Sequence, residues 1–220
     1  MIPKIIHYCW FGRGPKPKSV LDYIEGWKEK CFDYEIIEWN EDNFDVNMFA
    51  FTKEAYKAGK YAFVSDVCRL YALLKYGGVY LDTDVRVLKS FDKYLNYKSF
   101  IGKEAPFKVS TAVIGAEANC RWLKSFYNYY QEKHFITKKG MFNNIENTAI
   151  LTTLLNRLYP DYLDELEIFD IDIFCGKLYS KKKYMITERT VSVHEFSGTW
   201  INKPLYGYER IKNIIKRFGT

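Results

Sequence analysis

Short apolar segments with strand character alternate with amphipathic, helix-like segments along most of the chain, and this pattern limits the possible folds more than any other feature. The segment Ile2–Trp10 is rich in β-branched and aromatic residues, which is typical of a buried strand. A helix-like segment, residues 19–30, and a second strand, Glu35–Trp39, follow it. Strands that alternate with helices predict an α/β fold around a mixed or parallel sheet.

The later elements continue the alternation. The clearest helix, residues 61–76, carries apolar residues three and four positions apart and so has one face for a core. Gly77 stands where a left-handed C-cap is expected, and Ser19 is the predicted N-cap of the first helix. We predict further helices over residues 48–58, 118–133, 146–158 and 206–218, and further strands over 79–81, 85–88, 100–102, 109–115, 166–173 and 191–193. The 220 residues contain no repeat and no linker, which predicts one domain over residues 1–220.

Composition excludes several classes of protein. Hydrophobic residues make up 48% of the chain, enough for a sizeable core, yet no apolar stretch reaches the roughly 18–20 residues needed to cross a bilayer. The N-terminus lacks the pattern of a signal peptide, and the five cysteines stand singly, which is typical of a reducing cytoplasm rather than of a disulfide framework. With three histidines in the chain, a multi-histidine metal site is nearly excluded. We therefore expect a cytoplasmic protein.

Two carboxylates follow directly after a short apolar strand. Residues 77–84 read Gly-Gly-Val-Tyr-Leu-Asp-Thr-Asp, so Asp82 and Asp84 would share one face of a regular strand. Two such acids repel each other unless water or a cation separates them, and a hard ion such as Mg²⁺ or Mn²⁺ takes carboxylate ligands. A solvated turn is the alternative for an isolated Asp-x-Asp. The Gly-Gly and the apolar strand favour a metal site, because ligands of open α/β sheets bind at the carboxyl ends of strands.

A charged pair lies on the helix that precedes this strand. Asp66 and Arg69 are three positions apart and therefore project from one face of the helix. The simplest interpretation is a local helix ion pair, which contributes about a few tenths of a kcal/mol when it is exposed. However, the helix is otherwise apolar around the pair and leads directly into the Asp-x-Asp strand. Both charges are thus predicted to face the same cleft as the metal.

Three motifs in this order resemble those of glycosyltransferase family 32. They are Pro3–Gly12 (PKIIHYCWFG), Ser65–Leu70 (SDVCRL) and Gly77–Val85 (GGVYLDTDV), and the resemblance returns at Val193–Trp200. The family comprises sugar-nucleotide-dependent transferases with an Asp-x-Asp motif, found in capsular-polysaccharide clusters and among yeast mannosyltransferases, and its core is similar to that of the large clostridial glucosylating toxins. The resemblance is strong over residues 1–90 and thinner over 91–190. It implies a GT-A-like, Rossmann-related domain with a mixed central sheet, in which residues 1–90 form the donor- and metal-binding core.

The resemblance implies roles for individual residues. Trp10 matches the aromatic that stacks on the base of the donor, and Asp66 and Arg69 match the pair that holds the sugar hydroxyls and the diphosphate. Asp82 matches the acid near the ribose and the water shell of the metal, while Asp84 matches the direct metal ligand. The donor-binding residues implied are His7, Trp10, Asp66, Arg69, Asp82, Thr199 and Trp200, and the catalytic ones are Asp66, Arg69 and Asp84.

A late motif bears on the third metal ligand. The family usually reads His-x-x-x-x-Ser-Trp, and here Thr199 replaces the serine and keeps its hydroxyl. A late histidine completes the metal shell in several related transferases, which places His194 with Asp82 and Asp84 as a metal ligand. Glu195 is the alternative, because the toxins use an acid five residues before the tryptophan, and a structural role for either residue is a third interpretation. The chain lacks the Thr-Gly-Pro that family members often carry near residues 147–149, which weakens the resemblance on the acceptor side.

These assignments predict a retaining hexosyltransferase that uses Mn²⁺ or Mg²⁺. It would move a hexosyl group from a nucleoside-diphosphate sugar, with UDP-hexoses favoured over GDP-mannose, to a glycan or lipid-linked saccharide in surface polysaccharide synthesis. The barrier comes from charge separation between an oxocarbenium-like sugar and the departing diphosphate, which the metal and Arg69 would stabilise. Because the sequence offers no obvious carboxylate nucleophile, we expect a front-face displacement in which a diphosphate oxygen takes the proton of the acceptor.

Two other functions would use the same features. A metal-dependent phosphohydrolase also uses paired acids, although such sites generally recruit more carboxylates or histidines than this chain offers. A non-enzymatic membrane-peripheral module would bind anions through the C-terminal end, where ten Lys and Arg residues stand against three acids from residue 177 onward. The basic tail, residues 200–220, is predicted either to pack on the body or to dock on the anionic inner face of the plasma membrane, where a lipid-linked acceptor would be presented. Nucleic acid is not an expected partner, because the aromatic residues are dispersed rather than clustered with basic ones.

Overall fold

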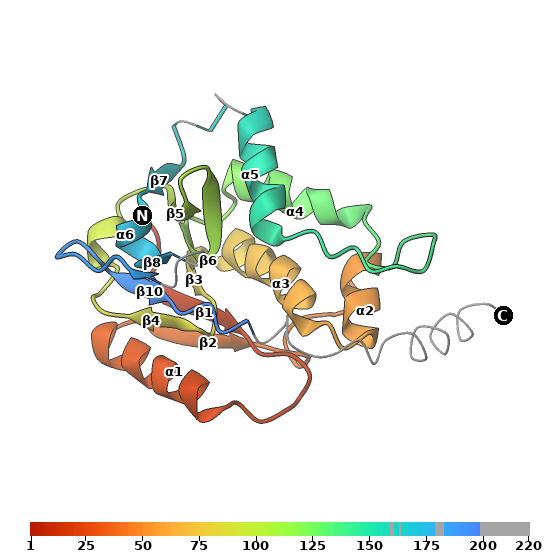
Figure 1. The fold of residues 1–220 in the computed structure, drawn as a ribbon, viewed down its shortest axis with the longest axis horizontal. Helices are drawn as coiled ribbons and strands as arrows, with labels where there is room; N and C mark the ends of the chain where they lie inside the picture. Colours follow the sequence, from red (N-terminus) through yellow and green to blue (C-terminus); the bar gives the residue numbers. More distant parts are fainter. Residues whose placement is uncertain (159–160, 163, 179–182, 199–220) are drawn as a thin grey trace.

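A six-stranded mixed sheet forms the centre of the computed structural model of the protein (Figure 1). The structure describes residues 1–158, 161–162, 164–178 and 183–198. The strands are β1 (Ile5–Cys9), β2 (Glu35–Trp39), β3 (Gly78–Leu81), β5 (Ser99–Ala105), β6 (Lys108–Ala116) and β7 (Glu167–Phe169), in the spatial order β2-β1-β3-β6-β5-β7. Among these strands β6 runs against the other five. The predicted α/β class with a mixed sheet is confirmed.

Helices cover both faces of the sheet (Figure 1). On one face lie α2 (Ala50–Lys57), α3 (Tyr61–Tyr76), α4 (Arg121–Gln131) and α5 (Asn147–Leu158). On the other lie α1 (Lys18–Lys30), α6 (Ile171–Phe174) and a small antiparallel pair of strands, β4 (Val85–Val87) and β10 (Ser192–His194). The side chains of β3 alternate between the two cores, with Tyr80 in the first and Val79 and Leu81 in the second.

The remaining elements are short. A 3₁₀ turn, η1 (Asp92–Tyr94), precedes β5, and β8 (Lys177–Leu178) pairs with β9 (Lys183–Tyr184). Among the residues described, no helix combines the length and the apolar character that a membrane span requires. The predicted helix over 206–218 and the basic tail 200–220 lie outside the described residues.

Several predicted boundaries shift by a few residues, and two predictions differ further from the structure. Helix α1 begins at Lys18 with Pro17 at the N-cap position, rather than after a Ser19 cap, because the φ of Pro17 is already −58° and its carbonyl accepts the amide of Val20 at 3.0 Å. The strand predicted over 166–173 divides, since β7 ends at Phe169 and α6 begins after Asp170. Neither difference moves a predicted site residue.

The turn between α3 and β3 requires glycine at two consecutive positions. The amide of Gly77 donates to the Leu73 carbonyl at 2.9 Å and closes α3, with a φ of +67°. Gly78 has a φ of +108°, and a Cβ added there would lie 2.6 Å from the carbonyl oxygen of Ile5 in β1. This turn sets the start of the strand that leads to Asp82.

Replacing Gly78 with alanine should therefore lower the free energy of unfolding by about 3 kcal/mol or more, since the new side chain meets both a strained φ and a backbone atom. Gly26 lies inside α1, and a Cβ there would meet nothing within 4 Å, so Gly26→Ala should instead raise stability by about 0.5–1 kcal/mol. Urea denaturation of both variants measures the two effects. If Gly78→Ala were as stable as the wild type, the turn would tolerate a side chain at this position.

Candidate functional site

The two carboxylates of the Asp-x-Asp motif stand in the tight turn between β3 and β4. The amide of Asp82 donates to the Ala112 carbonyl of β6 at 2.9 Å, and the amide of Val85 closes the turn on the Asp82 carbonyl at 3.0 Å. The side chain of Asp82 is 27% exposed and that of Asp84 is 16% exposed. The acids therefore converge through a turn rather than along a regular strand, and they do so at the predicted carboxyl end of β3.

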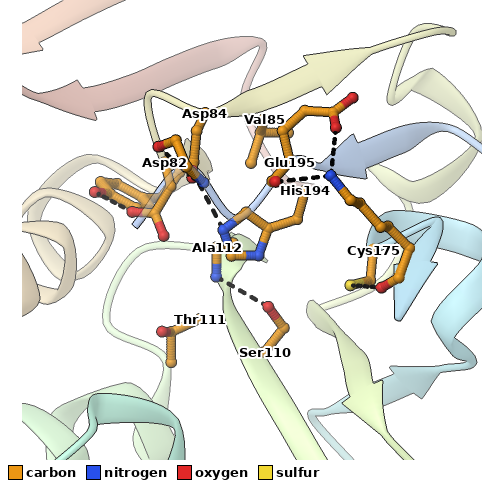
Figure 2. Close-up of polar contacts among 12 residues, drawn as sticks. Asp82, Asp84, Val85, Ser110, Thr111, Ala112, Cys175, His194 and Glu195 are labelled. Atoms are coloured by element: carbon orange, nitrogen blue, oxygen red, sulfur yellow. Dashed lines mark hydrogen bonds and ion pairs between the residues drawn. The ribbon is translucent and has the colours of Figure 1, made fainter. Parts of the chain in front are cut away.

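β10 brings a residue from far along the chain to Asp84. The antiparallel register of β10 with β4 places His194 opposite Val85, and the His194 Nε2 lies 3.3 Å from the Asp84 Oδ1 (Figure 2). Ser197 donates to the Asp84 Oδ2 from both its amide, at 2.8 Å, and its hydroxyl, at 2.9 Å. Donors therefore reach both oxygens of Asp84.

The charges of Asp84 and His194 depend on each other. Burial alone would raise the pKa of Asp84, but the hydrogen bonds from His194 and Ser197 lower the pKa to about 2. Burial alone would lower the pKa of His194, but the hydrogen bond to Asp84 and the neighbouring carboxylates raise it to about 10. At neutral pH the pair thus consists of a carboxylate and an imidazolium.

Asp82, Asp84 and His194 form a group that fits a divalent cation. One ligand atom of each residue lies within 4.8 Å of those of the other two. Carboxylate oxygens suit both Mg²⁺ and Mn²⁺, and an imidazole nitrogen is a common additional ligand of transition metals. All three residues are at most partly exposed, and within the described ranges the Nδ1 of His194 has no hydrogen-bond partner. The structure brings together all three residues that the sequence predicted as metal ligands.

Glu195 occupies a different position from its neighbour. Its carboxylate accepts hydrogen bonds from the Lys177 ammonium at 2.9 Å, the Tyr184 hydroxyl at 2.7 Å and the Arg86 guanidinium at 3.2 Å. Burial would raise the pKa of Glu195, but these donors outweigh burial and lower it. Glu195 therefore ties β4, β8 and β9 together, and the geometry favours His194 over Glu195 beside the Asp-x-Asp turn.

Arg69 connects Asp66 on α3 to the Asp-x-Asp turn. Its Nη2 donates to the Asp66 Oδ1 at 2.8 Å, and its Nη1 lies 3.2 Å from the Asp82 Oδ1. The same Nη1 donates to the Thr111 carbonyl of β6 at 2.7 Å, and the guanidinium carbon lies 4.6 Å from the centre of the Tyr80 ring. Asp66 and Arg69 thus face the same site as Asp82, as the sequence predicted.

This ion pair is buried, unlike an ordinary surface pair. The side chains of Arg69 and Asp66 are 5% and 12% exposed. Burial raises the pKa of Asp66 to about 6 in spite of the opposing charge of Arg69. Burial would lower the pKa of Arg69, but Asp82, Tyr80 and Asp66 raise it. Removing one member would leave the other charge buried and uncompensated, which is far more costly than losing a surface pair.

Besides Ser197, two residues of the site were not predicted from the sequence. The hydroxyl of Tyr80 donates to the Asp82 Oδ1 at 3.0 Å, a contact that the two-residue spacing on a strand could have indicated. Asn147, the first residue of α5, is buried beside Asp66 and helps to keep the pKa of that carboxylate down. Its Oδ1 accepts the Tyr130 hydroxyl at 2.8 Å, and its Nδ2 has no other partner in the described part of the chain. Only the packing of α5 on β6 and α4 brings Asn147 to the site.

The structure corrects the prediction for His7. Its ring is fully buried, its Nε2 donates to the Gly77 carbonyl at 2.8 Å, and its Nδ1 accepts the Trp39 indole N–H at 3.1 Å. Burial lowers the pKa of His7 to about 4, so the ring is neutral. Because both nitrogens are used inside the protein, the ring has no nitrogen left for a donor, and it supports the turn at Gly77.

Trp10 lies in the loop after β1, at the same edge of the sheet as Asp82. Its indole is half-buried, its Nε1 donates to the Gly14 carbonyl at 2.8 Å, and the Lys16 ammonium stands 5.9 Å from its ring. The ring is therefore held in place by its own loop, and its stacking on a base stays a prediction. Thr199 and Trp200, the other predicted donor contacts, lie outside the described residues.

The chain is similar to proteins described as transferases of sugars. Residues 17–101 match the family described as a glycosyltransferase sugar-binding region containing a DXD motif, and this range includes Asp66, Arg69, Asp82 and Asp84. The chain is 30% identical over 122 residues to inositol phosphoceramide mannosyltransferase 3 of Schizosaccharomyces pombe. That alignment covers 52% of this chain and 33% of the yeast protein, so the chain spans about a third of the length of this relative.

Solved structures of low sequence identity share the fold. PaToxG glycosyltransferase superimposes with a TM-score of 0.57 at 18% identity, over 72% of this chain and 70% of that chain. A glycosyltransferase involved in the glycosylation of the major capsid of PBCV-1 gives 0.51 at 13% identity, over 97% and 100%. The galactosyltransferase LgtC, in complex with donor and acceptor sugar analogs, gives 0.51 at 12% identity, over 97% and 95%. The GT-A-like fold implied by the sequence is confirmed.

Proposed function

We propose that the protein is a metal-dependent glycosyltransferase that moves a hexosyl group from a nucleoside-diphosphate sugar to a saccharide acceptor. The observation that carries this proposal is the continuous polar cluster from Asp66 through Arg69 and Asp82 to Asp84 and His194. A site for a sugar nucleotide needs a carboxylate for the sugar hydroxyls, a cation for the diphosphate and metal ligands next to the diphosphate. In the cluster these are Asp66, Arg69 and the group of Asp82, Asp84 and His194, respectively. The match to a DXD sugar-binding region and the similarity to a yeast mannosyltransferase support the proposal.

Asp82, Asp84 and His194 would hold Mn²⁺ or Mg²⁺. Such an ion neutralises the charge of a leaving diphosphate. His194 would bind it as a neutral imidazole and give up the proton that it shares with Asp84. The chain itself keeps the two carboxylates in place, through Ser197 on Asp84 and Tyr80 on Asp82.

Arg69 and Asp66 would bind the two halves of the donor. Arg69 is held from three sides, by Asp66, Asp82 and the Thr111 carbonyl, so its guanidinium has a fixed position next to the predicted diphosphate. Asp66 uses its Oδ1 for Arg69, and its second oxygen is the one we assign to the hydroxyls of the donor sugar. Fixed charges of this kind stabilise a transition state without reorganisation at the moment of reaction.

Retention of anomeric configuration by front-face displacement fits the same cluster. Among the described residues of the cluster, each carboxylate is already engaged: Asp66 and Asp82 with Arg69, and Asp84 with His194 and Ser197. A double displacement would need a carboxylate free to attack the sugar. We therefore propose that a diphosphate oxygen of the donor accepts the proton of the attacking hydroxyl.

The identity of the third metal ligand is testable with two variants. His194→Ala should weaken Mn²⁺ binding at least about tenfold, because a ligand is removed. Glu195→Gln should bind Mn²⁺ as the wild type does, but should lose about 1–3 kcal/mol of stability as its charged hydrogen bonds to Lys177 and Arg86 weaken. Calorimetric titration with Mn²⁺ and urea denaturation measure both. If Glu195→Gln weakened Mn²⁺ binding as much as His194→Ala, the ligand would be Glu195.

The donor and the acceptor are proposed by chemical class. The family resemblance favours a UDP-hexose, and the name of the yeast relative adds GDP-mannose to the donors that need testing. A glycan or a lipid-linked saccharide is the proposed acceptor, within surface polysaccharide synthesis. Contact of residues 200–220 with an anionic membrane stays a prediction.

The products of donor turnover separate this proposal from a phosphohydrolase. Transfer, or slow donor hydrolysis, breaks the bond between the sugar and the diphosphate and gives UDP from a UDP-hexose. A phosphohydrolase breaks the diphosphate and gives UMP and a hexose 1-phosphate. Phosphorus NMR of the reaction mixture resolves the two outcomes: UDP supports the glycosyltransferase, and UMP with hexose phosphate contradicts it.

A further inference from the structure

An almost fully exposed aromatic side chain stands at the tip of the hairpin between β5 and β6. The two strands pair as far as Ala105 and Lys108, so Pro106 and Phe107 form the tip, and Phe107 is 94% exposed. Beside it lies a groove of about 240 Å³. The hairpin, α5 and β7 line the groove through Lys103, Pro106, Phe107, Lys108, Val109, Thr152, Leu155, Asn156 and Ile168. Ligand sites are typically concave and mostly apolar with a few polar groups, and the lining of this groove has that composition.

This groove and the Asp-x-Asp turn lie at the same edge of the sheet. β3 and β5 both run antiparallel to β6, so their carboxyl ends point the same way. Thr111 of β6 accepts a hydrogen bond from Arg69, and Phe107 stands four residues before it, about 13 Å away along the strand. α5 makes a second connection, since Asn147 lies beside Asp66 and Asn156 in the groove is nine residues further, about 13 Å along the helix.

The charges in the groove are balanced. The Lys108 ammonium pairs with Glu104 at 2.9 Å and with Glu146 at 2.5 Å, and Lys103 pairs with Asp170 at 3.3 Å. A surface that docks on anionic lipid or on nucleic acid needs uncompensated positive charge. The groove therefore favours an uncharged ligand.

We propose that this groove is a subsite for an uncharged sugar unit of the acceptor, which stacks on the ring of Phe107. A pyranose has a C–H face that packs on an aromatic ring and hydroxyls at its edge that bond to groups such as the Asn156 amide. A groove of about 240 Å³ lies just below the roughly 300–1,000 Å³ typical of drug-sized ligands, which suits one sugar ring. The proposal rests on the proposed function, and it means that the acceptor is longer than a single sugar.

Saccharide binding in the absence of donor tests the subsite. The probes are three uncharged trisaccharides, maltotriose, cellotriose and mannotriose, and saturation-transfer NMR with titration gives the Kd of each. Phe107→Ala should raise the Kd of the bound trisaccharide about 5–10-fold, while Phe107→Tyr, which keeps the ring, should bind like the wild type. Phe32 is 85% exposed near the amino end of β2, the opposite edge of the sheet, so Phe32→Ala is the matched control and should change nothing.

The subsite would be overturned if no probe bound to the wild type, or if Phe107→Ala bound the trisaccharide as tightly as the wild type. It would also be overturned if the wild type sedimented with anionic lipid vesicles and Phe107→Ala did not. The last result would assign the patch to a membrane. Failure of the wild type to release nucleoside diphosphate would overturn the proposed function separately, because the binding measurement does not use the donor.

Discussion

Asp84→Asn should lower the rate of donor turnover at least about 1,000-fold and leave the protein folded. The amide has the size of the carboxylate and can still accept the hydrogen bonds of Ser197, but it carries no charge for His194 or for a divalent ion. A thousandfold loss corresponds to about 4 kcal/mol, within the several kcal/mol that a catalytic metal supplies. Release of nucleoside diphosphate at saturating Mn²⁺ measures turnover, and circular dichroism reports the fold.

Asp172 provides the matched control for loss of a buried acid. It lies in α6, outside the Asp-x-Asp turn, and pairs with Arg189 at 2.9 Å and with the Thr187 hydroxyl at 3.0 Å. Asp172→Asn should reduce stability and leave turnover near that of the wild type. If Asp84→Asn behaved in the same way, Asp84 would be a structural acid and the metal assignment would be wrong.

Arg69→Met should reduce turnover by about 100–1,000-fold and stability by about 3–5 kcal/mol. The first effect follows from the loss of the fixed cation beside the diphosphate. The second follows because Asp66 and Asp82 lose their shared partner and Asp66 stays buried. Turnover by nucleoside-diphosphate release and urea denaturation measure the two effects independently.

A double variant separates the structural from the functional part of this ion pair. In Arg69→Met with Asp66→Asn, the uncompensated buried charge is gone, so much of the lost stability should return. Turnover should stay as low as in the single variant, because neither the cation for the diphosphate nor the carboxylate for the sugar is restored. Recovery of both stability and turnover would show that the pair serves only the fold.

Local patterns were sufficient to predict much of the sheet and half of the site. The apolar strand behind Gly77 and Gly78 ends at Asp82 as predicted, and the three-residue spacing of Asp66 and Arg69 on one helix face produces the observed contact. These features depend on the backbone geometry of a few neighbouring residues, so the local spacing of residues is enough to predict them. The same holds for the positive φ of Gly77, whereas that of Gly78 was not predicted.

Long-range pairing decided what local patterns left open. His194 and Glu195 are adjacent in sequence, and only the register of β10 with β4 shows that His194 lies beside Asp84 while Glu195 binds Lys177 and Arg86. Pairing between segments about a hundred residues apart is a tertiary property without a local signal. The buried position of Asn147 beside Asp66 has the same origin.

His7 shows how a motif residue can serve the fold rather than the ligand. It belongs to the motif that resembles donor-binding segments, yet its ring bridges Trp39 and the Gly77 carbonyl inside the core. Either role would explain why a histidine belongs to this motif. It could contact the donor, or it could support the turn at Gly77, which positions the strand that leads to Asp82. Burial distinguishes the two roles, and the sequence of a strand that is buried on both faces does not show which role its polar side chain has.

The most direct measurement is the release of nucleoside diphosphate by the intact protein from UDP-glucose, UDP-galactose, UDP-N-acetylglucosamine and GDP-mannose, first with Mn²⁺ and then with a chelator. A metal-dependent glycosyltransferase built on Asp82, Asp84 and His194 should release nucleoside diphosphate from at least one donor, lose that release with the chelator and regain it when Mn²⁺ is added in excess. Release that is unchanged by the chelator would contradict the metal site. No release from any of the four donors would contradict the proposed function.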